Sequence, residues 1–244
     1  MSDAPMSADE LRATAERYPW YHTIDLGQGV STKGMFDHAP YLHHYPLPDD
    51  LSGKRCLDVA TMDGFWAFEL ERRGAASVTA LDLEKPEDLD WPASLRQGHD
   101  RSLDETKAER FAFVKRALGS NVERVVMSAY DLSPELGMFD YVHCGDLLLH
   151  IKDPMTVLEN IHSVCTERAL IVNVIKKFRF YEKRPMAELD GIDIFEWWVT
   201  NLTGLQRMVK AAGFSRLETA PTFEVPFTGG GEWKGLRGAI TAYV

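Results

Sequence analysis

Acidic residues and a glycine stand at the ends of consecutive apolar segments, where they could hold a nucleoside. Gly64, in the turn TMDGF, lets the backbone approach a ligand, and the helical run after it offers N-terminal amides to a polar group. Asp82 ends the next segment, 24 residues after Asp58, near the spacing of about 20 residues at which a carboxylate meets a ribose diol. Asp131 follows the third segment. Each feature alone suits a turn or a helix cap, but their order at successive strand ends indicates a nucleoside ligand.

Short apolar runs alternate with helical runs from residue 54 onward, and these elements must position the side chains just named. The predicted strands span 54–60, 77–83, 122–128, 139–145, 168–176, 216–225 and 236–244, and the predicted helices span 64–75, 106–119, 153–165 and 201–213. Strands that alternate with helices form a parallel sheet covered on both faces, and its ligands bind beyond the carboxyl ends of the strands. The last two strands have no helix between them, so they predict an antiparallel hairpin at one edge. We expect an α/β fold with a Rossmann-like, doubly wound and mostly parallel sheet of seven strands.

Two appendages accompany the predicted sheet. Residues 1–50 are expected to form an N-terminal helix and cap, because 7–17 begins with Ser and an acidic turn and 18–50 is rich in Gly, Pro, His and aromatic residues. Residues 51–244 are expected to form the sheet domain, with an aromatic lid inserted at about 177–200. Such a lid packs onto the sheet, walls an acceptor pocket, or does both.

The chain is acidic, with 37 Asp and Glu residues against 27 Lys and Arg residues and a net charge of −10. This charge disfavours a nucleic acid as partner, because phosphate contacts need a basic footprint, although the basic stretch 176–184 leaves a local patch open. No window reaches about 18 consecutive apolar residues, so no membrane span is expected. Isolated cysteines at 56, 144 and 165 predict buried free thiols, no metal site and a cytoplasmic protein. We expect a small-molecule partner and leave a homo-oligomer open.

Several segments resemble a known enzyme family. LDVATMDGFWAF, ALDL, AYDL and LLLHIKDP resemble the ordered motifs of class I S-adenosylmethionine-dependent methyltransferases over about residues 54–175. WYHTIDLGQGVSTKGMFDH, DLDWP and the later WWVTN and AAGF resemble the subfamily around the bacterial wobble-uridine tRNA carboxymethyltransferase, over most of residues 20–215. The resemblance implies that the Gly64 turn holds the methionine part of the cofactor, Asp82 the ribose and Asp131 the adenine end. It implies S-adenosylmethionine as cofactor and S-adenosylhomocysteine as product.

The sequence departs from this pattern at two places. Ala60 and Met62 stand where the family's turn has glycines, and the reduced room speaks against the pyrophosphate of a dinucleotide. Lys33 matches the lysine with which the carboxymethyltransferases hold carboxy-S-adenosylmethionine, but their tyrosine is Leu149 here and their C-terminal arginine has no match. A buried carboxylate that lacks half its partners is costly. We therefore expect the ordinary methyl donor rather than the carboxylated one.

Cofactor-binding residues are predicted along the strand ends, from the first turn to the end of the fourth strand. They are Asp58, Ala60, Met62, Gly64, Phe65, Asp82, Leu83, Asp131, Leu132 and Gly145, with Lys33 from the cap. The acceptor pocket is expected to use aromatic and polar side chains of the cap, the fourth strand end and the lid. They are Trp20, Tyr21, His38, Asp146, Phe180, Tyr181, Trp197 and Trp198. The lid also contains Phe178 and Phe195, and Phe65 and Trp66 are expected beside the cofactor.

Methyl transfer requires alignment of acceptor, methyl group and sulfur, and in some reactions the removal of a proton from the acceptor. His150, after the fourth strand, is predicted as general base, with His22 of the cap as a second candidate. The alternative for His150 is a hydrogen bond into the loop before the helix start at Asp153.

The predicted function is methyl transfer from S-adenosylmethionine to a small, aromatic or apolar metabolite. Two alternatives remain: a tRNA wobble-uridine (carboxy)methyltransferase, and a domain that binds S-adenosylmethionine without catalysis. The sequence leaves open whether oxygen, nitrogen or carbon accepts the methyl group.

Overall fold

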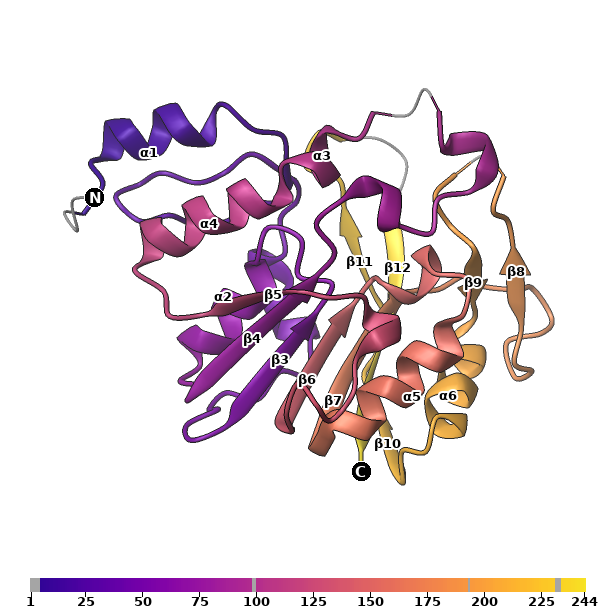
Figure 1. Cartoon of the computed structure of the whole chain (residues 1–244). Helices are drawn as coiled ribbons and strands as arrows, with labels where there is room; N and C mark the ends of the chain where they lie inside the picture. The colour runs from indigo at the N-terminus through magenta and orange to yellow at the C-terminus, as the bar shows by residue number, and fades with distance from the viewer. Residues whose placement is uncertain (1–4, 98–99, 193, 231–233) are drawn as a thin grey trace.

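An eight-stranded sheet forms the centre of the computed structural model, which describes residues 5–97, 100–192, 194–230 and 234–244 (Figure 1). Its strands are β3 (Arg55–Val59), β4 (Ser77–Asp82), β5 (Glu123–Val126), β6 (Phe139–Gly145), β7 (Cys165–Val174), β10 (Arg216–Thr219), β11 (Phe223–Pro226) and β12 (Lys234–Tyr243). The order across the sheet is β10, β12, β7, β6, β3, β4, β5, and β11 also pairs with β12. Strands β3 to β7 are parallel, and β12 is antiparallel to its neighbours. The predicted Rossmann-like, doubly wound fold is confirmed.

The strand predicted at 216–225 is two strands, so the sheet has one strand more than the seven expected. β10 pairs with residues 240–243 of β12, and β11 pairs with residues 234–237. Pro221 lies in the gap between the two short strands, and proline has no N–H to donate to a neighbouring strand. As a result β12 lies inside the sheet, between β7 and the two short strands.

Helices cover both faces of the sheet, and each face has its own apolar core (Figure 1). α2 (Phe65–Arg72) and α4 (Lys107–Leu118) pack on one face, and α5 (Pro154–Val164) and α6 (Leu202–Ala211) pack on the other. Neighbouring residues of β3 point to opposite faces, since Cys56 belongs to the first core and Leu57 to the second. Two covered faces explain why these strands read as continuous apolar runs.

The N-terminal segment belongs to the first core. α1 (Ala8–Ala15) begins at a capping box in which the side chains of Ser7 and Glu10 each accept from the other's backbone amide. β1 (Trp20–His22) and β2 (Gly34–Phe36) form a short parallel pair, and their buried rings join the same core. The predicted cap is therefore packed against the sheet domain and brings β1 to the strand ends.

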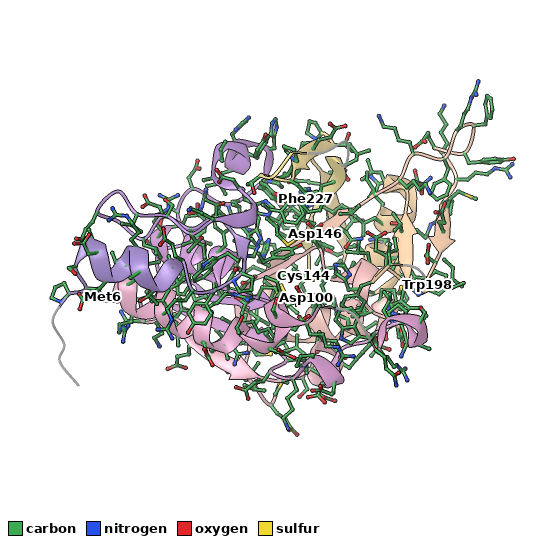
Figure 2. The ribbon with its side chains drawn as sticks, turned by 90° about the horizontal axis from the view of Figure 1, so that it is seen from above. Met6, Asp100, Cys144, Asp146, Trp198 and Phe227 are labelled. Carbon is green, nitrogen blue, oxygen red and sulfur yellow. The ribbon has the colours of Figure 1, made fainter. Side chains whose placement is uncertain are left out.

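Residues 176–200, apart from 193, form an arm that contains a hairpin, where the sequence predicts an aromatic lid at about 177–200. β8 (Ala187–Leu189) and β9 (Trp198–Thr200) pair antiparallel to each other. Figure 2 shows the arm projecting from the body of the molecule beyond Trp198. Phe180 of the arm is 85% exposed, whereas Trp197 donates its backbone N–H to the carbonyl of Leu149 in the body of the molecule.

All three cysteines are buried free thiols, as the sequence predicts. Burial raises the pKa of Cys56 and Cys165 to about 12, so both thiols stay protonated and unreactive at neutral pH. Among the helices in the described ranges, none combines the length and the apolar character that crossing a bilayer requires.

Candidate active site

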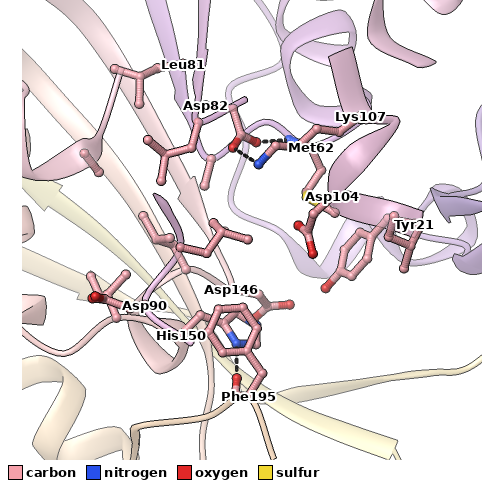
Figure 3. A pocket seen from close by; sticks show the side chains of 18 of the residues that line it. Tyr21, Met62, Leu81, Asp82, Asp90, Asp104, Lys107, Asp146, His150 and Phe195 are labelled. Carbon is pink, nitrogen blue, oxygen red and sulfur yellow. Dashed lines mark hydrogen bonds and ion pairs between the residues drawn. The ribbon is translucent and has the colours of Figure 1, made fainter. Parts of the chain in front are cut away.

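A cavity of about 270 Å³ opens beyond the carboxyl ends of β3, β4, β5 and β6 (Figure 3). This is the edge at which open α/β sheets bind their ligands. Met62, Asp82 and Lys107 lie together on one side, which we call the turn side, and Asp146, His150 and Phe195 lie on the other, the arm side. The cavity thus joins three parts of the chain: the strand ends, the N-terminal cap and the arm.

The turn between β3 and α2 holds three residues in left-handed backbone conformations. The φ angles are 63° at Ala60, 51° at Met62 and 96° at Gly64. A side chain at Gly64 would place its Cβ 2.4 Å from the ring of Phe68, so glycine is required there by both conformation and space. Ala60 and Met62 line the cavity, whereas Gly64 lies behind it. The turn therefore forms without the family's other glycines, at the cost of strain at two positions.

Helix α2 starts directly after this turn and has no side-chain cap at its N-terminus. The first amides of a helix have no partner within the helix, so they are available to a polar ligand group. Phe65, predicted as a cofactor contact, does not line the cavity and stacks on His22 at 5.5 Å between ring centroids. Its neighbour Trp66 does line the cavity.

Asp82 carries a buried ion pair on the turn side. Its Oδ2 accepts from the backbone N–H of Met62 at 2.7 Å, and its Oδ1 accepts from Lys107 Nζ at 2.7 Å. Only 6% of the Asp82 side chain and 1% of the Lys107 side chain are exposed. Lys107 is the first residue of α4 and was not predicted, because nothing in the chain between β4 and α4 fixes which helix residue faces Asp82.

The acid predicted for the adenine end lies outside the cavity. Asp131 is exposed, and Leu132 beside it is buried in the second core. The 3₁₀ turn η4 (Ala129–Asp131), capped by the Ser128 side chain, places Ser128, Ala129 and Tyr130 at the cavity instead. Leu83 and Gly145, by contrast, both line the cavity, and their contact with the cofactor stays a prediction. A Cβ at Gly145 would lie 2.8 Å from His143 Cε1, so only glycine fits there.

Two further residues that were predicted as cofactor contacts, Asp58 and Lys33, do not line the cavity. Asp58 is buried behind the turn, where it accepts from Thr61 Oγ1 and contacts His143 Nδ1, each at 2.7 Å, so it supports the turn from below. Lys33 does not line the cavity: its side chain is 87% exposed and lies 4.0 Å from Glu16. A cation for the extra carboxylate of a carboxylated donor is not supplied by Lys33.

His150 lines the arm side, and its environment determines its tautomer (Figure 3). Nδ1 is hydrogen-bonded to the backbone carbonyl of Phe195. Because a carbonyl can only accept, Nδ1 carries the proton and Nε2 keeps a free lone pair. Burial lowers the pKa of His150, although the Phe195 carbonyl and Asp146 act in the opposite direction. The ring is therefore neutral at pH 7. Its hydrogen bond goes to Phe195 in the arm rather than to the loop before Asp153, and a role of His150 as general base stays a prediction.

His22 also lines the cavity, but its Nδ1 is engaged by the carboxylate of Asp63. Asp63 further accepts from the backbone amides of Tyr21 at 2.9 Å and His22 at 3.1 Å, and Arg110 Nε lies 3.9 Å away. Burial alone would raise the pKa of Asp63, but His22 and Arg110 hold it below its ordinary value. These hydrogen bonds hold β1 against the turn, so the main role of His22 is to connect the cap to the turn.

Of the predicted acceptor residues, Tyr21, His38 and Asp146 line the cavity. His38 bonds to the hydroxyl of Tyr45 at 2.8 Å, and burial holds its pKa well below the ordinary value. Asp146 has a left-handed backbone, with φ of 48°, and accepts from Arg237 Nε at 2.7 Å. Arg237, 1% exposed on β12, was not predicted, because it lies 91 residues away and no motif marks it.

The five other aromatic residues predicted for the acceptor pocket do not line the cavity. Trp20 is 3% exposed in the first core, where its indole donates to the Ala15 carbonyl. Phe180 and Tyr181 of the arm do not line the cavity and are 85% and 48% exposed. Trp197 and Trp198 do not line the cavity, and their indole N–H groups donate to the backbone carbonyls of Asp90 and Lys152.

A different aromatic wall forms the arm side. The ring of Phe195 stacks on Trp91 at 4.1 Å and lies 5.0 Å from the His150 ring. Asp90 accepts from the Tyr130 hydroxyl at 2.6 Å and lines the same side. Asp90 and Trp91 both belong to the segment DLDWP, so that motif was the signal that could have identified them.

Comparisons with known proteins agree with this geometry. A family model described as "Methyltransferase domain" matches residues 35–219. The N-terminal domain of EvdMO1, crystallised with S-adenosylhomocysteine, is 17% identical with a TM-score of 0.61, covering 100% of this chain and 98% of that domain. The 1,6-didemethyltoxoflavin-N1-methyltransferase of Burkholderia thailandensis, with its acceptor and S-adenosylhomocysteine bound, is 19% identical with a TM-score of 0.51, covering 84% of this chain and 73% of that one. An S-adenosylmethionine-dependent methyltransferase of Mesorhizobium loti is 13% identical with a TM-score of 0.51, covering 85% and 97%.

At these identities the structural likenesses show the fold. A search among curated proteins finds no match. The assignment of residues to roles therefore depends on the chemistry of the cavity itself.

Proposed function

This chain belongs to the methyltransferase-domain family, and from that premise we propose that it transfers the methyl group of S-adenosylmethionine to a hydroxyl of a small acceptor. The observation that carries the proposal is the neutral His150, which lines the cavity with its Nδ1 proton engaged and its Nε2 lone pair free. A hydroxyl is a poor nucleophile until a base takes its proton, so a base at this place favours an oxygen acceptor.

The turn side fits S-adenosylmethionine by the chemistry of its groups. Asp82 offers acceptor oxygens to ribose hydroxyls, and Ser128, Ala129 and Tyr130 border the space for the adenine. The uncapped N-terminus of α2 offers amides to the methionine carboxylate. When bound, S-adenosylmethionine supplies a methyl group that its sulfonium has already activated.

The arm side suits a small acceptor with a flat ring or an apolar face. Trp91 and Phe195 form the wall on which such a ring stacks, and His150 continues that wall. His150 takes the acceptor's proton at Nε2, while the Phe195 carbonyl holds the other nitrogen in place. The toxoflavin-precursor methyltransferase of similar fold binds a small heterocycle, which is consistent with an acceptor of this size.

A phosphate-bearing acceptor such as tRNA is disfavoured. Among the described residues that line the cavity, aspartates dominate the charged groups, and the single lysine, Lys107, lies against the carboxylate of Asp82. Phosphates would meet like charge there. The net charge of −10 acts in the same direction over the whole molecule.

Label transfer tests the proposal. The protein is incubated with S-adenosylmethionine carrying an isotopically labelled methyl group and a cell extract, which is then separated into small-molecule, RNA and protein fractions. We expect label in the small-molecule fraction as a methyl ether, lost in His150→Ala and retained in His43→Ala, whose side chain is exposed away from the cavity. Label in RNA, or no transfer by the wild-type protein, would refute the proposed function.

A further inference from the structure

Lys107 is a buried cation with unused hydrogen-bonding capacity in the wall of the cavity. Its side chain is 1% exposed, and among the described residues its one hydrogen-bond acceptor is Asp82 Oδ1. An ammonium group has three N–H donors, so two remain for other acceptors. Buried donors are nearly always paired in folded proteins, and Lys107 lines the cavity, so water in the cavity or a bound ligand supplies the missing acceptors.

Asp82 has complementary capacity on the acceptor side. Its two oxygens accept one bond each, from the Met62 amide and from Lys107. A carboxylate has about four lone-pair sites, so it can accept further donors. The Met62 amide also fixes the orientation of the carboxylate relative to the turn. The ion pair therefore presents free acceptors and free donors side by side, in a rigid place.

A hydroxyl group is the ligand group that uses both halves of such a pair. It donates one proton and accepts through its oxygen, so it can donate to Asp82 and accept from Lys107 at once. A phosphate or carboxylate could use only Lys107 and would be repelled by Asp82, and an ammonium group could use only Asp82. The chemistry of the pair thus favours a neutral group that both donates and accepts, and the ribose hydroxyls are such groups in S-adenosylmethionine.

We propose that Lys107 is a donor-binding residue, which acts with Asp82 on one hydroxyl of the ribose of S-adenosylmethionine and of its product. This inference rests on the proposed function, because it takes the turn side as the nucleoside site. Lys107 then contributes to affinity through a charged hydrogen bond to the ribose oxygen, in addition to orienting Asp82.

Calorimetric titration separates a direct contact from a merely structural ion pair. The ligands are S-adenosylhomocysteine and its 2′-deoxy and 3′-deoxy analogues, and the proteins are wild type, Lys107→Met and Lys115→Met, a lysine of the same helix that does not line the cavity. We expect Lys107→Met to weaken S-adenosylhomocysteine by about tenfold or more, and Lys115→Met to leave it unchanged. One of the two deoxygenations should weaken wild-type binding by a similar factor, and that loss should largely disappear in Lys107→Met.

If removal of a ribose hydroxyl weakens binding equally in wild type and Lys107→Met, Lys107 does not contact that hydroxyl. The same conclusion follows if neither deoxy analogue binds wild type more weakly than S-adenosylhomocysteine does. If wild type itself fails to bind S-adenosylhomocysteine, the proposed function fails first, so the two failures are distinguishable. Lys107→Met leaves Asp82 buried without its cation, and thermal unfolding shows whether it folds. Should it unfold, Asp82→Asn combined with Lys107→Met removes both charges and takes its place, with the same loss of sensitivity to deoxygenation expected.

Discussion

The tautomer of His150 decides which nitrogen can act as base, and the arm sets that tautomer through the Phe195 carbonyl. We predict that His150→Ala lowers kcat by about 10² to 10⁴-fold while S-adenosylhomocysteine affinity stays near wild type. Because the pKa of His150 is lowered, its base form persists below pH 6.5, so turnover should be flat from about pH 8 to pH 7 and fall only on further acidification. Steady-state rates across pH measure this, and an alanine variant with wild-type turnover at every pH would exclude His150 as base.

Gly64 and Gly119 both have left-handed backbones, but only Gly64 is crowded, so substituting each with alanine distinguishes backbone strain from steric crowding. At Gly64 a Cβ would meet the Phe68 ring at 2.4 Å, whereas at Gly119, with φ of 61°, nothing lies within 4 Å. We predict that Gly64→Ala lowers the free energy of unfolding by about 2 kcal/mol or more, through strain plus overpacking, and Gly119→Ala by only about 1 kcal/mol. Urea denaturation of the two variants measures the difference. Equal losses would mean that the turn can shift to make room.

At the residue scale the sequence predicted well where one position follows directly from a strand end. Asp82 and Gly145 end β4 and β6, so their place beside the cavity follows from the strand pattern. Asp131 was predicted at the cavity, but the three-residue turn η4 determines which of its side chains faces the cavity, and Tyr130 lines it instead. Lys107 and Arg237 were missed because tertiary packing brings them to Asp82 and Asp146 from distant elements.

Strand β1 and the turn before α2 are joined by one buried carboxylate. Asp63 is fully buried beside Arg110, which is also fully buried, and it accepts two backbone amides of β1. We predict that Asp63→Asn lowers the free energy of unfolding by about 3 kcal/mol or more, because Arg110 loses its counter-charge. Asp49→Asn, at a fully exposed carboxylate, should change it by less than about 0.5 kcal/mol. Chemical denaturation compares the two, and similar small effects would show that the cap is held by its apolar core alone.

Elements with a strong period were predicted closely, and the connecting segments were not. α4, α5 and β6 lie within a few residues of the expected ranges, because their apolar patterns match one covered face of a sheet. The aromatic residues of the arm follow no regular spacing, so the sequence predicts neither its hairpin nor which ring faces the cavity. Phe195 faces the cavity because it stacks on Trp91. An aromatic residue in such a segment can be exposed, as Phe180 is, or wall the cavity.

Acidification should destabilise the whole molecule before its carboxylates titrate. Burial holds the pKa of His38 well below its ordinary value and lowers that of His150, whereas both have a pKa of about 6.5 when unfolded. The unfolded state therefore binds more protons below about pH 6.5, and the free energy of unfolding falls as pH drops toward the folded pKa values. We predict lower stability at about pH 5.5 than at about pH 7.5 in urea titrations, with a shallower slope in His38→Gln and an unchanged slope in the exposed His43→Gln. A pH-independent stability over this range would contradict the lowered pKa values of His38 and His150.

The cavity exists only in the assembled fold. The strand ends supply Asp82 and Gly145, the cap supplies Tyr21 and His38, and the arm supplies Phe195. The sequence located the first part by its strand pattern and the second by its aromatic content. The third part depends on how the arm returns to the body, and no local pattern predicts that.

Calorimetric titration of S-adenosylhomocysteine tests the nucleoside site most directly, with wild type, Asp82→Ala and Asp131→Ala as the three proteins. We predict one binding site in wild type, affinity reduced by about tenfold or more in Asp82→Ala, and no change in Asp131→Ala, because the structure places Asp82 in the cavity and Asp131 outside it. Absence of binding in wild type, or a loss caused by Asp131→Ala and not by Asp82→Ala, would contradict the placement of the methyl donor at the end of β4.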